Sequence, residues 1–119
     1  EGNIQKATDI GALGIDIPTV DTPEQAMQAA RYARYPPEGR RSEGANQAGS
    51  LWGANRADYR KTINDNMLVI VQIETPIGAW NALPIAQQPG IGKLHQDSIH
   101  RGNADFVALL HQSAKHFFG

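Results

Sequence analysis

The chain contains the stretch Met67-Leu-Val-Ile-Val-Gln-Ile-Glu74, in which Gln72 is the only polar side chain before the final acid. Such a run of Val, Ile and other apolar residues is typical of a strand that is buried on both faces of a parallel sheet. Glu74 then lies at the carboxyl end of that strand. In α/β barrels and open parallel sheets, ligands and catalytic groups collect at this edge. The stretch therefore predicts a buried parallel strand and makes Glu74 a candidate functional residue.

A second interpretation of Glu74 is that it only precedes a helix. Thr75 and Pro76 follow it directly, and Thr before Pro is a good N-cap followed by a good first helical residue. Position alone leaves both interpretations open.

The rest of the chain alternates helices with strands. We expect a helix over residues 3–10 that closes at Gly11, a strand over 13–18, a helix from a cap at Thr22 to about residue 34, and a helix from about 55 to 64. Ala26, Ala30 and Ala33 would lie on one face of the second helix beside Met27. This alternation predicts an α/β fold with parallel pairing.

The segment 35–53 is expected to be irregular, because Pro and Gly recur in it among polar residues. Long ordered connections inside compact domains are usually functional, and a flexible surface loop is the alternative.

Composition is typical of a soluble globular protein. The 119 residues leave room for one domain; 40% are hydrophobic, 19% are charged and the net charge is -1. There is no basic excess to suggest nucleic acid, and the longest apolar run is far below the ~18 residues that a membrane span needs. We therefore expect a cytoplasmic protein that binds neither nucleic acid nor membrane. Without cysteine, a metal would be held by oxygen or imidazole.

The last part of the chain carries weaker signals. Residues 90–93 contain glycines and a lysine, but the flanking positions lack the glycine and hydroxyl that a phosphate loop requires. His95, Asp97 and His100 are close in sequence, yet they match neither a helical face nor a closed zinc pattern, so a solvated loop is expected there. Residues 105–109 are predicted to form a short strand that runs into a helix.

Four segments of the chain form a recognisable set. They are Gly11-Ala-Leu-Gly-Ile-Asp-Ile-Pro18, Val20-Asp-Thr-Pro-Glu-Gln-Ala26, Arg34-Tyr-Pro-Pro-Glu-Gly-Arg-Arg41 and Val71-Gln-Ile-Glu-Thr75. In this order they resemble the class II, divalent-metal-dependent 2-oxo-acid aldolases of the HpcH/HpaI aldolase/citrate lyase family. Similarity continues through Trp80 and Leu83 to residues 89–91, and more loosely over 102–118.

The resemblance implies a fold and a site. The fold would be a partial (β/α)8 TIM barrel of the phosphoenolpyruvate/pyruvate type, a single domain over 1–119 with central β/α units in 1–91 and the last strand and helix in 102–119. Glu74 would coordinate Mg2+ or Mn2+, which binds a 2-oxo acid cleaved through a pyruvate enolate. Gln72 would orient the substrate or a water, or would be a satisfied polar residue inside a barrel layer.

The chain also departs from the family pattern. The family's second metal ligand is an Asp in a Gly-Pro-x-Asp segment, which has no match after Ile91, and the Arg and His of its first strands have no counterpart. Catalytic residues are therefore unassigned. A full barrel takes ~250 residues, so we expect a shortened or partial member whose exposed strand edges favour a homo-oligomer. The alternative to an active lyase is a non-catalytic binding or oligomerising module.

Overall fold

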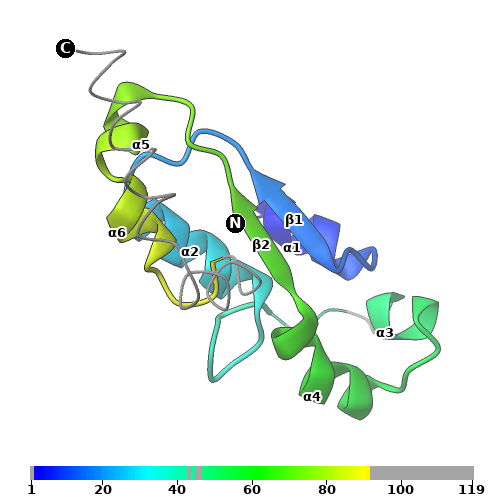
Figure 1. Ribbon diagram of the computed structural model, residues 1–119. Helices are drawn as coiled ribbons and strands as arrows, with labels where there is room; N and C mark the ends of the chain where they lie inside the picture. Colours follow the sequence, from blue (N-terminus) through cyan, green and yellow to red (C-terminus); the bar gives the residue numbers. More distant parts are fainter. Residues whose placement is uncertain (1, 43, 45–46, 92–119) are drawn as a thin grey trace.

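The computed structural model describes residues 2–42, 44 and 47–91 of the chain (Figure 1). Helices precede, separate and follow two strands along this length, which is the α/β fold that the sequence predicts. In chain order the elements are α1 (Gly2–Asp9), β1 (Gly14–Ile17), α2 (Pro23–Ala33), α3 (Gln47–Leu51), α4 (Arg56–Asn66), β2 (Leu68–Val71), α5 (Pro76–Trp80) and α6 (Ala82–Ala86).

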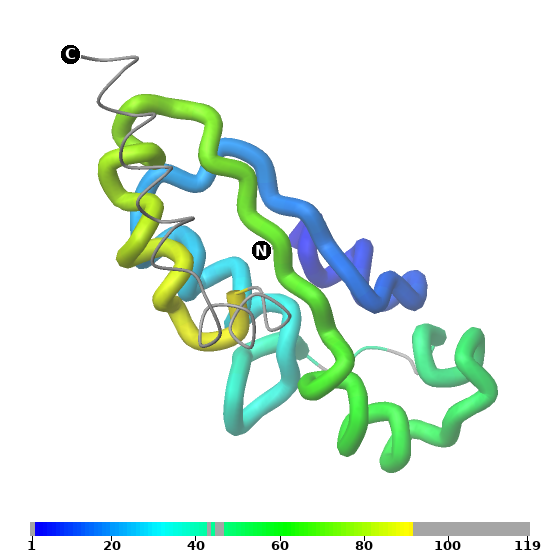
Figure 2. Tube along the Cα trace, viewed as in Figure 1, coloured from blue at the N-terminus to red at the C-terminus, as the bar shows by residue number. Residues whose placement is uncertain are grey.

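The two strands of the described chain form a parallel sheet, which confirms the predicted pairing. The register runs from Gly14 opposite Leu68 to Ile17 opposite Val71. Beyond the last pair, the N–H of Gln72 donates to Ile17 O at 2.8 Å, and the N–H of Val20 donates to Gln72 O at 3.0 Å. The two segments that follow β1 and β2 therefore stay side by side past the carboxyl ends of the strands, as the tube in Figure 2 shows.

Helix α2 packs on the sheet through a face of alanines. Its N-terminus carries the expected cap at Thr22, which accepts from the N–H of Gln25 and forms a capping box with that residue. The predicted face of small residues is confirmed and includes one further alanine, whereas Met27 beside it is 36% exposed. Small side chains let the helix approach the strands closely. The buried alanines are Ala26, Ala29, Ala30 and Ala33.

The opposite face of the sheet is exposed in the described residues. Val69 is 0% exposed, but Ile70 next to it is 45% exposed. The prediction that this strand is buried on both faces is therefore wrong for the described part of the chain, because its helices cover one face only. The strand is also shorter than the apolar run, since Met67 caps α4 and Ile73 lies beyond β2.

The connection between α2 and α4 is more ordered than predicted. The expectation that 35–53 is irregular is wrong at α3, whose Ala48 is 3% exposed. Gly53, with φ +66, ends this helix. The N–H of Gly53 donates to Ser50 O and that of Ala54 to Gly49 O, which is the Schellman pattern of a helix C-terminus.

Arg34 joins the ends of three elements. Its buried guanidinium donates to Ala30 O at 3.2 Å, Asn64 O at 3.3 Å and Met67 O at 2.9 Å. The side chain of Asn64 meanwhile accepts from the N–H of Tyr35 and donates to Tyr35 O. These contacts fix the end of α2 against the end of α4, at the point where β2 begins.

Arg41 fixes the other side of the same connection. Its guanidinium carbon lies 4.5 Å from the centre of the Tyr35 ring, and Nη2 forms an ion pair with Asp9 Oδ1 at 3.0 Å. The Arg41 side chain is 1% exposed, so this contact ties α1 to the segment after α2 inside the protein.

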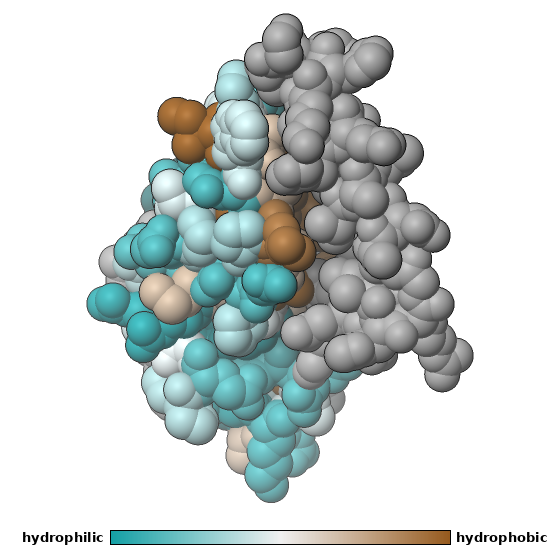
Figure 3. Space-filling view, turned by 60° about the vertical axis from the view of Figure 1, so that its left-hand side comes forward, coloured by the Kyte–Doolittle hydropathy of each residue, from teal (hydrophilic) through white to brown (hydrophobic). Residues whose placement is uncertain are grey.

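Several large apolar side chains nevertheless remain at the surface. Figure 3 shows one face on which most described side chains are hydrophilic and the hydrophobic ones form small separate groups. Exposed apolar residues of this kind are ordinary on folded proteins when they are scattered. The most exposed are Ile10, Leu51, Trp52, Ile77 and Trp80.

Replacing Arg34 by Lys should destabilise the fold. Lysine keeps the charge but cannot present the planar fork that reaches three carbonyl oxygens, so we expect the free energy of unfolding to fall by about 2 kcal/mol. Urea denaturation measures this. Arg31→Lys, at an exposed position of the same helix, is the control and should change stability by less than about 0.5 kcal/mol. Equal effects of the two variants would contradict the role of Arg34.

Stability should also fall at alkaline pH through Tyr35. Burial, with smaller contributions from Tyr59 and Asp9, raises the pKa of Tyr35 above its ordinary value of 10.0, although Arg41 and Arg60 oppose the shift. A raised pKa in the folded state gives stability that is fully present below pH 10.0 and is lost as pH rises through the folded pKa.

The check is urea unfolding at about pH 9 and about pH 11. Tyr35→Phe should show a smaller loss of stability over this interval than the wild type. Tyr32→Phe, at a half-buried tyrosine of α2, is the control and should keep the wild-type loss. An unchanged loss in Tyr35→Phe would show that this phenol is not responsible.

Candidate functional site at the carboxyl end of the sheet

The candidate site lies where β1 and β2 end. Parallel strands bring their carboxyl ends to the same edge of a sheet, so the residues that follow β1 face those that follow β2. The register fixes which residues meet, because Ile17 pairs with Val71. Thr19 thereby comes beside Glu74, and Asp16 beside Gln72.

Glu74 is held by one residue on the β1 side. Its Oε2 accepts a hydrogen bond from the N–H of Thr19 at 2.9 Å and another from Thr19 Oγ1 at 3.0 Å. Glu74 is exposed. Within the described part of the chain, no hydrogen bond reaches Oε1. The carboxylate therefore has one oxygen bound by Thr19 and one oxygen to which no described residue donates.

Thr19 has an unusual backbone conformation. Its φ is +53, the only positive φ at a non-glycine among the described residues. For a β-branched residue this left-handed conformation costs about 1–2 kcal/mol. Such a conformation persists only where surrounding contacts impose it. Here they include the two hydrogen bonds to Glu74 and the bond from the N–H of the next residue, Val20, to Gln72 O.

Gln72 is held in the same manner. Its Nε2 donates to Asp16 Oδ2 at 2.7 Å, and both residues are exposed. Asp16 pairs with the exposed Ile70, so the Gln72–Asp16 contact belongs to the face of the sheet that α2 does not cover. The amide oxygen of Gln72 and its second N–H hydrogen are not used in this contact.

Asp21 and Thr75 connect the segment after β1 to the start of α5 at this edge. Thr75 caps α5 by accepting from the N–H of Gly78 at 3.0 Å, and its hydroxyl donates to Asp21 Oδ1. Asn81 Nδ2 also donates to Asp21 O at 2.7 Å. The helix-start interpretation of the segment after Glu74 is thus confirmed for Thr75, while Glu74 itself contacts Thr19 rather than the helix.

Sequence reasoning missed three members of this edge: Asp16, Thr19 and Asp21. Asp16 could have been found by the signal that singled out Glu74, since it is an acid inside an apolar segment, Gly14-Ile-Asp-Ile17. Thr19 and Asp21 carry no comparable signal. Their roles depend on the register, which the sequence does not specify.

The described residues can supply only part of a metal site. They contain no group of three or more His, Asp or Glu side chains that could hold a metal ion. Glu74 offers one carboxylate, and oxygen ligands are those that Mg2+ prefers. This carboxylate fits the expected metal as one ligand of a larger set. His95, Asp97 and His100 lie outside the described residues.

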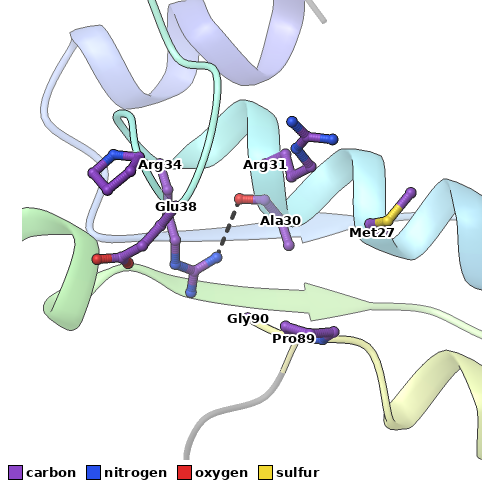
Figure 4. A pocket seen from close by; sticks show the side chains of 8 residues that line it. Met27, Ala30, Arg31, Arg34, Glu38, Pro89 and Gly90 are labelled. Carbon is purple, nitrogen blue, oxygen red and sulfur yellow. Dashed lines mark hydrogen bonds between the residues drawn. The ribbon is translucent and has the colours of Figure 1, made fainter.

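A separate hollow of about 510 Å³ lies between α2 and the segments that follow α2 and α6 (Figure 4). The guanidinium of Arg34 points into it, and the dashed line in the figure marks its bond to Ala30 O. Because Arg34 is committed to carbonyl oxygens, the hollow adds no free charge from that residue. Its lining comprises Met27, Ala30, Arg31, Arg34, Pro37, Glu38, Pro89 and Gly90. It shares no residue with the candidate site.

Comparison with known proteins identifies the family. A model of the HpcH/HpaI aldolase/citrate lyase family matches residues 1–118, and the chain belongs to this family. The predicted resemblance is therefore confirmed. No helix of the described residues is long and apolar enough to cross a membrane.

The similar curated proteins are named as aldolases. The chain is 36% identical over 107 residues to 5-keto-4-deoxy-D-glucarate aldolase of Klebsiella pneumoniae, covering 90% of this chain and 40% of that protein. It is 38% identical over 108 residues to hydroxypyruvate/pyruvate aldolase of Deinococcus radiodurans, covering 90% and 37%. The chain thus spans about two fifths of the length of these relatives.

Two solved structures of the same family have a fold similar to that of this chain. An HpcH/HpaI aldolase/citrate lyase family protein from Burkholderia cenocepacia J2315 matches with a TM-score of 0.67 and 28% identity, covering 93% of this chain and 48% of that one. An HpcH/HpaI aldolase from Desulfitobacterium hafniense DCB-2 matches with a TM-score of 0.69 and 26% identity, covering 95% and 47%.

The contacts of Thr75 with Asp21 and with the start of α5 can be tested by substitution. Thr75→Val removes the acceptor that caps α5 and the donor to Asp21 while keeping the shape, so we expect the free energy of unfolding to fall by about 1–2 kcal/mol. Thr62→Val, which removes an exposed hydroxyl that bonds only carbonyls of its own helix, should change it by less than about 0.5 kcal/mol. Urea denaturation of both variants checks this. A smaller effect at Thr75 than at Thr62 would contradict it.

Proposed function

We propose that this chain carries part of the active site of a divalent-metal-dependent carbon-carbon lyase, an aldolase that acts on a 2-oxo acid. The observation that carries the proposal is Glu74 at the carboxyl end of the sheet, with Oε2 bound by Thr19 and no donor on Oε1 among the described residues. Membership of a family whose similar proteins are named as aldolases supports the reaction class.

Glu74 would be the metal ligand of the site. Glu74 would hold Mg2+ or Mn2+ through Oε1, because hard cations of this size prefer carboxylate and water. When bound, the cation supplies positive charge beside the keto oxygen, where negative charge develops as the carbon-carbon bond breaks; this is worth several kcal/mol. The electron pair of the broken bond would pass to the pyruvate portion as an enolate, and the other portion would leave as an aldehyde once a general base, which is unassigned, takes its hydroxyl proton.

Gln72 would orient the substrate. Asp16 accepts one hydrogen of its amide group, which fixes the rotation of that group. The remaining N–H hydrogen and the amide oxygen are then directed by the protein rather than by solvent. A group held in this manner can bind a carboxylate or hydroxyl of a 2-oxo acid without losing further freedom.

The fold we propose is a partial (β/α)8 barrel. The parallel pair β1 and β2, with α2 on one face and an exposed opposite face, is what two neighbouring units of such a barrel present, since the barrel interior is filled by inward side chains of all its strands. We propose central units in 1–91 and a last unit in 102–119, which lies outside the described residues.

One carboxylate rarely holds Mg2+ tightly, so further ligands would be needed. We propose a homo-oligomer, because both edges of the sheet are unpaired in the described part of the chain, and unpaired edges favour pairing with another chain. The second metal ligand would then come from outside the described residues.

Titration with Mn2+ in the presence of pyruvate tests the proposal. The full chain should bind Mn2+ saturably in calorimetry, and Glu74→Gln should weaken binding by more than about tenfold, because the variant replaces a charged ligand by a neutral one. Glu24→Gln, at an exposed acid in the first turn of α2, is the control and should bind as the wild type does.

Two results would contradict the proposal. Wild-type affinity in Glu74→Gln would exclude Glu74 as the ligand. No binding to a folded wild-type chain would exclude the metal site and favour the non-catalytic binding or oligomerising module.

A further inference from the structure

We propose that Thr19 is a positioning residue that fixes the Glu74 carboxylate so that one chosen oxygen faces the metal. This inference rests on the proposed function of Glu74 as a metal ligand. It concerns a residue that would not itself touch the metal or the substrate. Its action would pass entirely through the two hydrogen bonds to Oε2.

The first observation is that both donors of Thr19 reach the same oxygen. The N–H lies 2.9 Å from Oε2 and Oγ1 lies 3.0 Å from it, although the two residues are 55 positions apart in the chain. Hydrogen bonds to an ionised group are among the stronger ones in proteins. Two of them on one oxygen restrain both the position and the rotation of the carboxylate.

The second observation is the left-handed backbone at Thr19. Its φ of +53 is disfavoured for threonine, whose branched side chain crowds the backbone there. Glycine would adopt the same conformation without strain. Thr19 is strained, and both of its donors bind one candidate ligand. Strained residues of this kind are expected at functional sites, where the surrounding structure imposes their conformation.

The consequence concerns an exposed side chain with several torsions. Free Glu74 would sample many rotamers and would lose that freedom on binding a metal. Bound to Thr19, it has lost most of that freedom already, and Oε1 is the oxygen left for a ligand. Because a single carboxylate holds Mg2+ weakly, prior orientation of this kind would contribute much of the affinity that the site can reach.

Three substitutions at Thr19 separate positioning from folding. Thr19→Val keeps the shape and the N–H but loses the hydroxyl, and we expect the Mn2+ affinity to fall about tenfold, the lower end of the effect of removing such partners. Thr19→Ser keeps both donors and should stay within about twofold of the wild type. Thr19→Gly loses the hydroxyl while relieving the backbone.

Thr19→Gly gives the most selective result. It should raise the urea midpoint of unfolding, because glycine accepts the positive φ, and it should still weaken Mn2+ binding about tenfold, as Thr19→Val does. A merely structural role would change stability and affinity in the same direction. This variant also keeps the test valid if Thr19→Val fails to fold.

The measurement is the dissociation constant of Mn2+ with pyruvate present, by electron paramagnetic resonance of free Mn2+, with the full chain and Glu74→Gln as reference. Weak binding in Glu74→Gln with wild-type binding in Thr19→Val and Thr19→Gly would overturn the role of Thr19 and leave the proposed function standing. Wild-type binding in Glu74→Gln would overturn both. Weak binding in Glu74→Gln, Thr19→Val and Thr19→Gly, with recovery in Thr19→Ser, is the expected result.

Discussion

The parallel register between β1 and β2 is the constraint on which the rest of the structure depends. Because the side chains of a strand alternate between faces, the pairing of Ile17 with Val71 decides at once which residues are buried and which meet at the carboxyl edge. A shift of one position would expose Val69 and separate Thr19 from Glu74. Burial of the core and assembly of the candidate site are therefore one event.

Among the described residues, the side-chain hydrogen bonds of Glu74 and Gln72 cross between the two strands. Glu74 is bound by Thr19 and Gln72 by Asp16, so each residue after β2 has its partner on the β1 side. Neither residue relies on its own loop for orientation. An edge built in this manner can be rigid although its side chains are exposed, which reconciles access for a small molecule with fixed geometry.

Local signals made much of the fold predictable. The cap at Thr22, the cap at Thr75 and the apolar strand were each confirmed because they depend on neighbours in sequence. Helix α3 was missed because its signal is Gly53, the glycine of the Schellman pattern. Several other glycines occur in the same segment, so this one could not be told apart as the end of a helix. The prediction that both faces of β2 are buried was wrong for the described residues, because burial depends on which elements cover each face. Thr19 could not be predicted at all, since threonine is disfavoured at positive φ.

The partners of Arg34 give the junction of α2, α4 and β2 an uncommon chemical character. Its three hydrogen bonds go to carbonyl oxygens, which are neutral dipoles. Ionic strength weakens attraction between exposed charges and acts much less on buried contacts. The two buried arginines thus anchor the chain by different means, Arg34 through dipoles and Arg41 through the half-buried Asp9. Glu38 and Asp65 also attract the charge of Arg34, although burial outweighs them and lowers its pKa. The strand that leads to Glu74 is therefore tied to the core by buried hydrogen bonds, on which ionic strength acts little.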